Sequence, residues 1–255
     1  MTPGAKTSEQ SKPAPAVSCS DCQARGVPCA LESHTTNLRT RRGQTLALVL
    51  DGAEAVFIVR AGVLILQIAL PGIARQVVGI YFPGDVLRSS FAPPHAEATL
   101  VSASPGEVWR MRFAALETLA AGDPAIMHYL DEAIASRMAR QALHAATLGQ
   151  FDCTQRVATF LVELALRTGV SSPAGGVVFD LPFNRKDIAD YLGLNPDTLS
   201  RIMSRFKAAG LIGHSERNRA VVRDFGSLAA RSPAAQSLIE ISGSRRVKAT
   251  LGTTV

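Results

Sequence analysis

The segment 184–212 constrains the fold more than any other part of the chain, because its residues mark two short helices with a tight turn between them. It reads NRKDIADYLGLNPDTLSRIMSRFKAAGLI. Asn184 is a typical helix cap, and Gly193 supplies the backbone freedom that ends a first helix. Asn195 and Pro196 then give a second helix its cap and its first-turn proline. The pattern predicts two helices joined by a turn of three or four residues.

Each predicted helix has one apolar face, formed by Ile188, Ala189 and Leu192 in the first and by Leu199, Ile202 and Phe206 in the second. A small residue lets two helices cross closely, and this spacing is that of a helix-turn-helix, whose second helix enters the major groove of DNA. Polar side chains face outward from that helix and are the predicted DNA contacts: Asp197, Thr198, Ser200, Arg201 and Arg205.

Each outward residue of the second helix has chemistry that suits DNA. Arg201 could make the two-pronged contact to O6 and N7 of guanine, worth about 1 to 3 kcal/mol of discrimination. Thr198 and Ser200 suit a base edge or a phosphate. Asp197 could accept a hydrogen bond from an amino group of cytosine or adenine. Its alternative role is a first-turn acid that complements the helix dipole.

The stretch after the second helix, LIGHSERNRAVVRD, predicts two short strands about a polar turn. Such a wing would carry Arg217, Arg219 and Arg223 to the phosphate backbone. Residues 181–231 hold nine Lys and Arg against five acidic residues, whereas residues 43–120 hold five Arg against six. The positive charge therefore gathers where DNA binding is predicted. The alternative is a surface that contacts protein.

The first half of the chain consists of short apolar runs separated by Gly and Pro. The runs are TLALVL, AVFIV, GVLILQIAL, QVVGIYF, ATLVSA and EVWRMRF. Several short strands at this spacing predict a β-sandwich or a barrel. Residues 1–17, rich in Pro, Ser, Thr, Lys and Ala, predict a disordered lead.

A long helix is predicted from residue 124, since neither Pro nor Gly occurs between Pro124 and Gly149. Its apolar stripe would bury against a partner helix or against the chain's own barrel, and consists of Ile126, Leu130, Ile134, Met138 and Ala142. We expect Arg137 and Arg140 at a solvated edge of this helix. A second helix is predicted over residues 153–168.

A barrel, a long helix and a winged helix in this order resemble the Crp/Fnr family of bacterial transcription regulators. The likeness covers about residues 36–230 and is most specific at 187–212 and at Tyr81-Phe82-Pro83-Gly84-Asp85. It implies a homodimer that binds palindromic promoter DNA and acts on RNA polymerase. In the Fnr and FixK branch the recognition helix carries Glu, Ser and Arg at the spacing held here by Asp197, Ser200 and Arg201, which implies a TTGAT-type half-site.

The resemblance implies an α+β architecture with five regions. They are a disordered lead with a cysteine cluster (1–35), a cyclic-nucleotide-binding-like β-barrel or jelly roll (36–123), a dimerisation helix (124–150), a winged helix-turn-helix (151–235) and a flexible tail (236–255).

Two kinds of signal are considered for the regulator, a small ligand bound in the barrel and a chemical change at the cysteines. Cyclic-nucleotide-binding members of the family use a Gly-Glu and an Arg-Ser pair that flank a short helix. Here Gly84-Asp85 and Arg88-Ser89 lie three residues apart, and no Arg-Ser pair precedes the run ATLVSA. A cyclic nucleotide or another small ligand is therefore kept as the alternative signal.

Three cysteines near the N-terminus, Cys19, Cys22 and Cys29, form the pattern C-x2-C-x6-C. An odd number of thiols in a reducing compartment does not predict a disulfide framework, whereas soft thiolates at this spacing suit an iron-sulfur cluster or zinc. Oxygen-sensing Fnr proteins resemble this arrangement, which implies that the three cysteines are ligands of a [4Fe-4S] cluster.

The resemblance places a fourth cysteine in the last barrel strand, but residues 107–112 contain no thiol. Cys153 lies beyond the long helix, about 40 Å along its axis. Glu32 or His34 could complete the set, and thiol redox chemistry or zinc binding are the alternatives. We predict a regulator that responds to oxygen or redox state.

No basic start followed by an apolar core and a cleavage site opens the chain, and no apolar run is long enough to span a membrane. These observations predict a cytoplasmic protein without a membrane partner. A thiol oxidoreductase is the rival class, but the sequence shows no phosphate loop and no catalytic triad, so we expect no enzyme.

Overall fold

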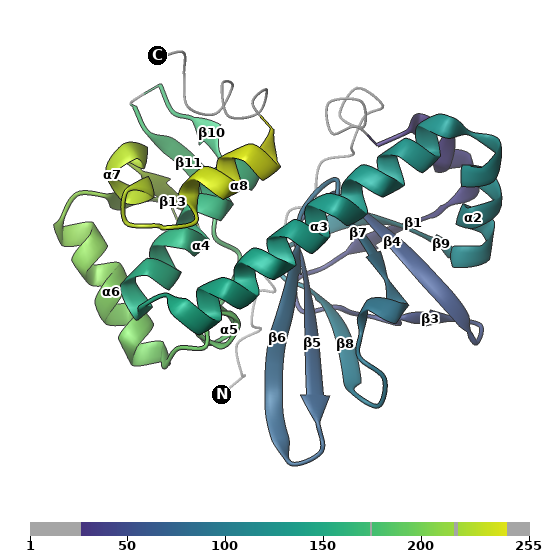
Figure 1. Cartoon of the computed structure of the whole chain (residues 1–255), viewed down its shortest axis with the longest axis horizontal. Coiled ribbons are helices and arrows are strands. Elements are labelled where there is room, and N and C mark those ends of the chain that lie inside the picture. Colours follow the sequence, from purple (N-terminus) through teal and green to yellow (C-terminus); the bar gives the residue numbers. More distant parts are fainter. Residues whose placement is uncertain (1–26, 174, 217–218, 244–255) are drawn as a thin grey trace, which may run out of the picture.

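The computed structural model describes residues 27–173, 175–216 and 219–243, and it places two globular halves on either side of one long helix. The β-rich half precedes this helix in the sequence and the smaller mixed half follows it (Figure 1). Within the described residues, no helix combines the length and the apolar character needed to cross a membrane.

The first half is two antiparallel sheets, as the alternating apolar runs predict. One sheet has the order β1-β9-β4-β3 with β7 paired to β4, and the other has the order β2-β8-β5-β6. The strands of the first sheet are β1 (Thr36–Thr40), β3 (Val49–Leu50), β4 (Ala53–Ala61), β7 (Val86–Arg88) and β9 (Gly106–Arg112). Those of the second are β2 (Thr45–Leu46), β5 (Leu64–Leu70), β6 (Ile73–Tyr81) and β8 (Glu97–Ser102). The run TLALVL thus supplies strands to both sheets.

The space between the sheets is filled by side chains. Phe57, Leu64, Leu87, Leu100 and Val108 are buried in one apolar cluster. Burial of such residues is the main stabilising contribution to the barrel. The 3-10 helix η2 (Ser89–Phe91) follows β7.

Two helices leave the barrel and a third opens the second half. They are α2 (Phe113–Gly122), α3 (Pro124–Gln150) and α4 (Cys153–Thr168). Asp123 caps α3 by accepting from the backbone N–H of Ala125, and Asp152 caps α4 in a capping box with Gln155. Both predicted helices, over 124–150 and 153–168, are confirmed, whereas α2 was not predicted.

The second half combines a small sheet with short helices. Its sheet has the order β10-β11-β13-β12. The elements are β10 (Val170–Ser171), β11 (Val177–Asp180), α5 (Arg185–Tyr191), α6 (Pro196–Ala208), β12 (Ile212–Glu216), β13 (Arg219–Val222), α7 (Phe225–Ala229) and α8 (Ala235–Ser242). The sequence analysis expected a flexible tail from residue 236, but residues 235–242 form α8. Leu238 of α8 is buried against the core of this half.

One apolar core joins the two halves. It contains Val77, Ile80 and Phe82 of the barrel together with Leu161 and Ile188 of the second half. The barrel and the second half are therefore packed against each other.

Candidate nucleic-acid interface

The predicted pair of helices is confirmed by α5 and α6. Asn184 accepts from the backbone N–H of Asp187, and Asn195 accepts from that of Asp197, so both predicted caps form. Gly193 takes φ = 60° in the turn between them, the left-handed region in which glycine carries no steric penalty. The N–H of Leu194 closes the turn on the carbonyl of Ala189 at 2.8 Å.

Helix α6 is amphipathic, with Leu199, Ile202 and Phe206 buried. Figure 1 shows α6 at the outer side of the second half, away from the barrel. Of the predicted contacts, Asp197, Arg201 and Arg205 are exposed on this helix, and Thr198 and Ser200 are half-buried. The exposed face therefore presents two guanidinium groups and one carboxylate.

Arg185, at the start of α5, adds a residue that the sequence analysis missed. Its Nη1 donates to the Oγ of Ser200 at 2.9 Å, and that hydroxyl donates in turn to the carbonyl of Pro196 at 2.9 Å. The Ser200 hydroxyl thus both accepts and donates a hydrogen bond within the protein. Arg185 is exposed and adds a positive charge beside the exposed face of α6. The available signal was its basic side chain directly after the cap Asn184.

The predicted wing is present as β12 and β13. Arg219 lies 3.2 Å from Asp180 of β11, measured from Nε to Oδ1, and Arg223 is exposed. Arg217 lies outside the described residues. Arg219 thus lies in β13 of the wing, bound to a carboxylate, and Arg223 directly follows that strand.

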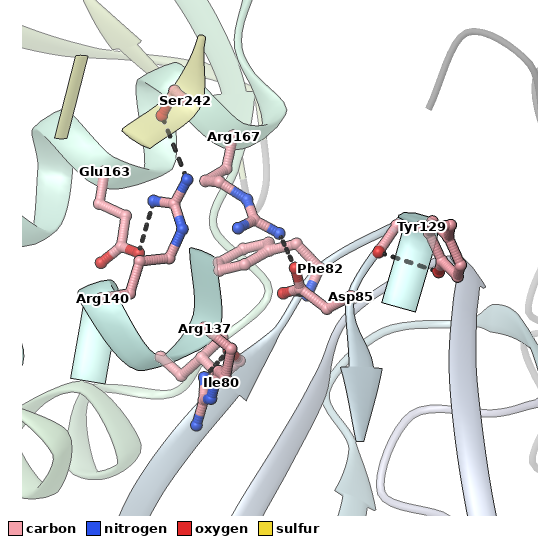
Figure 2. Close-up of polar contacts among 10 residues, drawn as sticks. Ile80, Phe82, Asp85, Tyr129, Arg137, Arg140, Glu163, Arg167 and Ser242 are labelled. Atoms are coloured by element: carbon pink, nitrogen blue, oxygen red, sulfur yellow. Dashed lines mark hydrogen bonds and ion pairs between the residues drawn. The ribbon is translucent and has the colours of Figure 1, made fainter. Parts of the chain in front are cut away.

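The arginines expected at a solvated edge of α3 are instead half-buried and bound to other parts of the protein (Figure 2). Arg140 is 9% exposed, and its guanidinium lies 3.3 Å from both Glu163 and the Oγ of Ser242. Arg137 stacks over Tyr81 and donates to the carbonyl of Ile80 at 3.2 Å. The expectation was wrong because the barrel covers Arg137 and the second half covers Arg140, and the sequence of the helix does not reveal either contact.

The first described residues of the chain pack on the barrel next to α3. Cys29 opens the 3-10 helix η1 (Cys29–His34) and is half-buried, while Glu32 and His34 are exposed. Val27 and Leu31 are buried beside Trp109, and the same cluster holds Ile126 and Tyr129 of α3.

The described residues do not complete a set of cluster ligands. Cys19 and Cys22 lie outside them, and Cys153 is exposed at the start of α4. Among the described residues there is no group of three His, Cys, Asp or Glu that could hold a metal ion. Strand β9, in which the family resemblance places a fourth cysteine, contains no thiol.

The residues that resemble a cyclic-nucleotide site are bound within the protein. Arg88 forms an ion pair with Glu54 at 3.0 Å and stacks over Phe113. Asp85 accepts from the N–H of Phe82 at 2.9 Å and pairs with Arg167. The hydrogen bonds of Arg88 lower the pKa of Glu54. Neither Asp85 nor Arg88 is left to hold a phosphate or a ribose.

An apolar cavity of about 440 Å³ lies between the second barrel sheet and α3. Its lining includes Leu66, Val78, Phe91, Ile134 and Met138. Most of the lining is apolar, and Tyr81, Arg137 and Gln141 are its polar members, so the cavity suits a largely apolar molecule better than a nucleotide.

Known proteins resemble this chain along most of its length. Residues 155–231 match the Crp-like helix-turn-helix domain. The transcriptional regulatory protein btr of Bordetella pertussis is 30% identical over 71% of this chain and 74% of that protein. The nitrogen fixation regulation protein FixK of Azorhizobium caulinodans is 29% identical over 69% of this chain and 71% of that protein.

Solved structures agree with the sequence relatives. FixK2 from Bradyrhizobium japonicum has a TM-score of 0.66 and 28% identity, and the match covers 79% of this chain and 98% of FixK2. Two sheets, a long connecting helix and a C-terminal helix-turn-helix are thus shared with a related regulator over nearly its whole length. The chain belongs to the Crp/Fnr family of DNA-binding transcription regulators.

Proposed function

We propose that this regulator binds a palindromic promoter site as a homodimer in the cytoplasm, acts there on RNA polymerase, and responds to oxygen or redox state through its N-terminal cysteines. The observation that carries the DNA-binding part is the exposed face of α6, where Arg201 and Arg205 project from a helix with a formed cap and a buried opposite face. Asp197 and Ser200 would lie beside Arg201 in the major groove, with the wing on the phosphates.

The proposed dimer is supported by the exposed face of α3. Met138 is 67% exposed, and small residues at Ala135, Ala142 and Ala145 flank it at spacings of three and four. This spacing is that of a two-helix seam, and small side chains would let two copies of α3 approach closely. Of the predicted stripe, Ile126 and Leu130 pack on the barrel, whereas Met138 and Ala142 are exposed and are the residues that we propose for the partner helix.

The proposed redox response rests on the cysteine pattern and on where Cys29 lies. Leu31 and Val27 anchor the segment to the cluster that contains the first turns of α3. A chemical change at the thiols would therefore act close to the proposed dimer seam. Cys19, Cys22 and Cys29 are the residues that would hold a cluster or zinc, and the described residues offer no fourth thiolate near Cys29.

The DNA-binding part is tested with Arg201→Ala. Specific binding should fall at least tenfold, because a two-pronged contact to guanine is lost, and binding to unrelated DNA should change little. Arg231→Ala removes an exposed arginine outside α6 and is the matched control. Fluorescence anisotropy over a salt series should also show the steep loss of affinity typical of phosphate contacts. Equal losses on both DNAs would contradict base reading by Arg201.

The redox part is tested by purifying the protein without oxygen and measuring visible absorption, iron and sulfide before and after air is admitted. Absorption that bleaches, and that Cys29→Ser abolishes, would support a cluster, with Cys153→Ser as the control. Colourless protein that binds DNA equally well with and without oxygen would contradict the redox proposal. It would leave DNA binding untouched.

The apolar cavity supports a second candidate, a regulator that responds to a small apolar ligand. Its walls come from β5, β6, η2 and α3, so an occupant would contact the barrel and the proposed dimer helix together. Such a regulator would keep its response to that ligand in a variant with all four cysteines replaced by serine, whereas a thiol-based regulator would lose its response.

A further inference from the structure

Helix α5, the first helix of the DNA-binding pair, is fastened to the edge of the barrel by four polar contacts. The N–H of Val77 donates to Oδ2 of Asp190 at 3.0 Å, and Nε2 of Gln76 donates to the backbone carbonyl of Asp190 at 2.5 Å. Nη2 of Arg75 lies 2.8 Å from Oδ1 of Asp187 and 3.7 Å from Oδ2 of Asp190. All three barrel residues are consecutive in β6, and both acids are on α5. The two elements are labelled in Figure 1.

The position of β6 gives these contacts their significance. It is the last strand of its sheet, so one side of its backbone has no neighbouring strand. An edge N–H must find another partner, and the Asp190 carboxylate provides one for Val77. A side chain that accepts from one particular backbone N–H also fixes where α5 sits along the strand.

An apolar contact lies directly beside the polar one. Val77 and Ile80 of β6 belong to the same buried cluster as Ile188 and Leu192 at α5. Apolar packing is non-directional, so it holds the two halves together without fixing one orientation. The polar contacts at the border of this apolar contact fix the orientation of α5 relative to β6.

We propose that Arg75, Gln76 and Asp190 are positioning residues for DNA binding, because they set the orientation of α5, and through it that of α6, relative to the barrel. The proposal rests on the palindromic binding proposed above. A dimer that engages two half-sites must present both recognition helices in register, one helical turn of DNA apart. A domain that is already held in place loses less freedom on binding and binds more tightly.

The test compares a palindrome with a single half-site. Arg75→Ala and Asp190→Ala should each weaken binding to the palindrome about three- to tenfold and leave half-site binding nearly unchanged. The exchanged pair Arg75→Asp with Asp187→Arg should recover most of the ratio of palindrome to half-site affinity. Arg75→Asp alone should not recover it. A role in stability alone would lower both affinities together.

Arg112→Ala is the matched control, since Arg112 forms an ion pair of the same length, 2.8 Å to Asp51, within the barrel. It should leave the affinity ratio unchanged. The proposal would be overturned if Arg75→Ala and Asp190→Ala kept the wild-type ratio of palindrome to half-site affinity, or if they bound the palindrome more tightly than the wild-type protein does.

A second measurement needs no DNA. In wild-type protein the amide of Val77 should exchange with solvent slowly, and Asp190→Ala should accelerate that exchange at least tenfold by NMR. Equal exchange in both proteins would overturn the proposal even if DNA binding failed. Failure of the wild-type protein to prefer the palindrome would instead contradict the proposed function.

Discussion

Arg167 donates to the carboxylate of Asp85 across 2.5 Å and thereby ties the last turn of α4 to the turn that follows β6 (Figure 2). The Arg167 side chain is 6% exposed, and its guanidinium stacks over Phe82. The same carboxylate accepts from the N–H of Phe82. Asp85 therefore links the barrel to the DNA-binding half, although its place after Gly84 resembles part of a ligand site.

Asp85→Ala should lower the free energy of unfolding by about 3 kcal/mol, because it leaves the Arg167 charge buried without a partner. Urea denaturation would measure the loss. Arg112→Ala, which breaks the exposed pair with Asp51, should cost less than about 1 kcal/mol. Similar small losses in both variants would show that the Asp85 pair contributes no more than a surface ion pair.

Gly193→Ala should destabilise the protein by about 1 kcal/mol, since residue 193 has φ = 60° and an alanine there is strained. A Cβ at this position would meet no atom closer than 3.4 Å, so the cost is that of the backbone alone. Gly122→Ala is the control, because Gly122 lies in α2 with open space around it. That variant should be stabilised by about 0.5 kcal/mol or more. Thermal denaturation of both would separate the two effects.

The stability of the protein should depend on His144 at mildly acidic pH. His144 of α3 stacks on Tyr191 of α5 with ring centres 4.0 Å apart. Burial, together with the charge of Arg137, lowers the pKa of His144 to about 4. The unfolded chain takes up a proton near pH 6.5, which the folded protein does not bind until about pH 4. The free energy of unfolding should therefore fall as the pH decreases through this window, by about 2 to 3 kcal/mol.

His144→Phe keeps a ring beside Tyr191 and removes the titrating group. Urea denaturation between pH 4 and 7 should then show a smaller loss of stability than in the wild-type protein. His128→Phe changes an exposed histidine of the same helix and should keep the wild-type profile. A His144→Phe profile that parallels the wild-type profile would contradict the prediction.

Met138→Glu should convert the proposed dimer to monomers at micromolar concentration, because it places a charge in the apolar seam between two copies of α3. Light scattering would measure the mass. Val170→Glu makes the same kind of change at an exposed apolar residue of β10 and should leave the mass unchanged. A Met138→Glu protein of unchanged mass would place the subunit contact elsewhere.

Local patterns predicted the elements that depend on neighbouring residues alone. Caps at Asn184 and Asn195 and the turn at Gly193 follow from contacts within five residues, so the helix pair was evident from the sequence. The same holds for α3 and α4, whose capping residues are Asp123 and Asp152. A helix whose boundary signals are local needs no knowledge of the rest of the fold.

The sequence by itself determined the fold class, the helix-turn-helix and the outward residues of α6, because these follow from short-range periodicity and capping. Only the tertiary structure decided the surroundings of Arg140, Asp85 and Asp190. Their partners Glu163, Arg167 and Val77 lie 23, 82 and 113 residues away in the chain. Which distant polar groups meet depends on how the two halves dock. Docking is driven by apolar packing, and the apolar pattern of the sequence does not specify which polar groups will lie at its border.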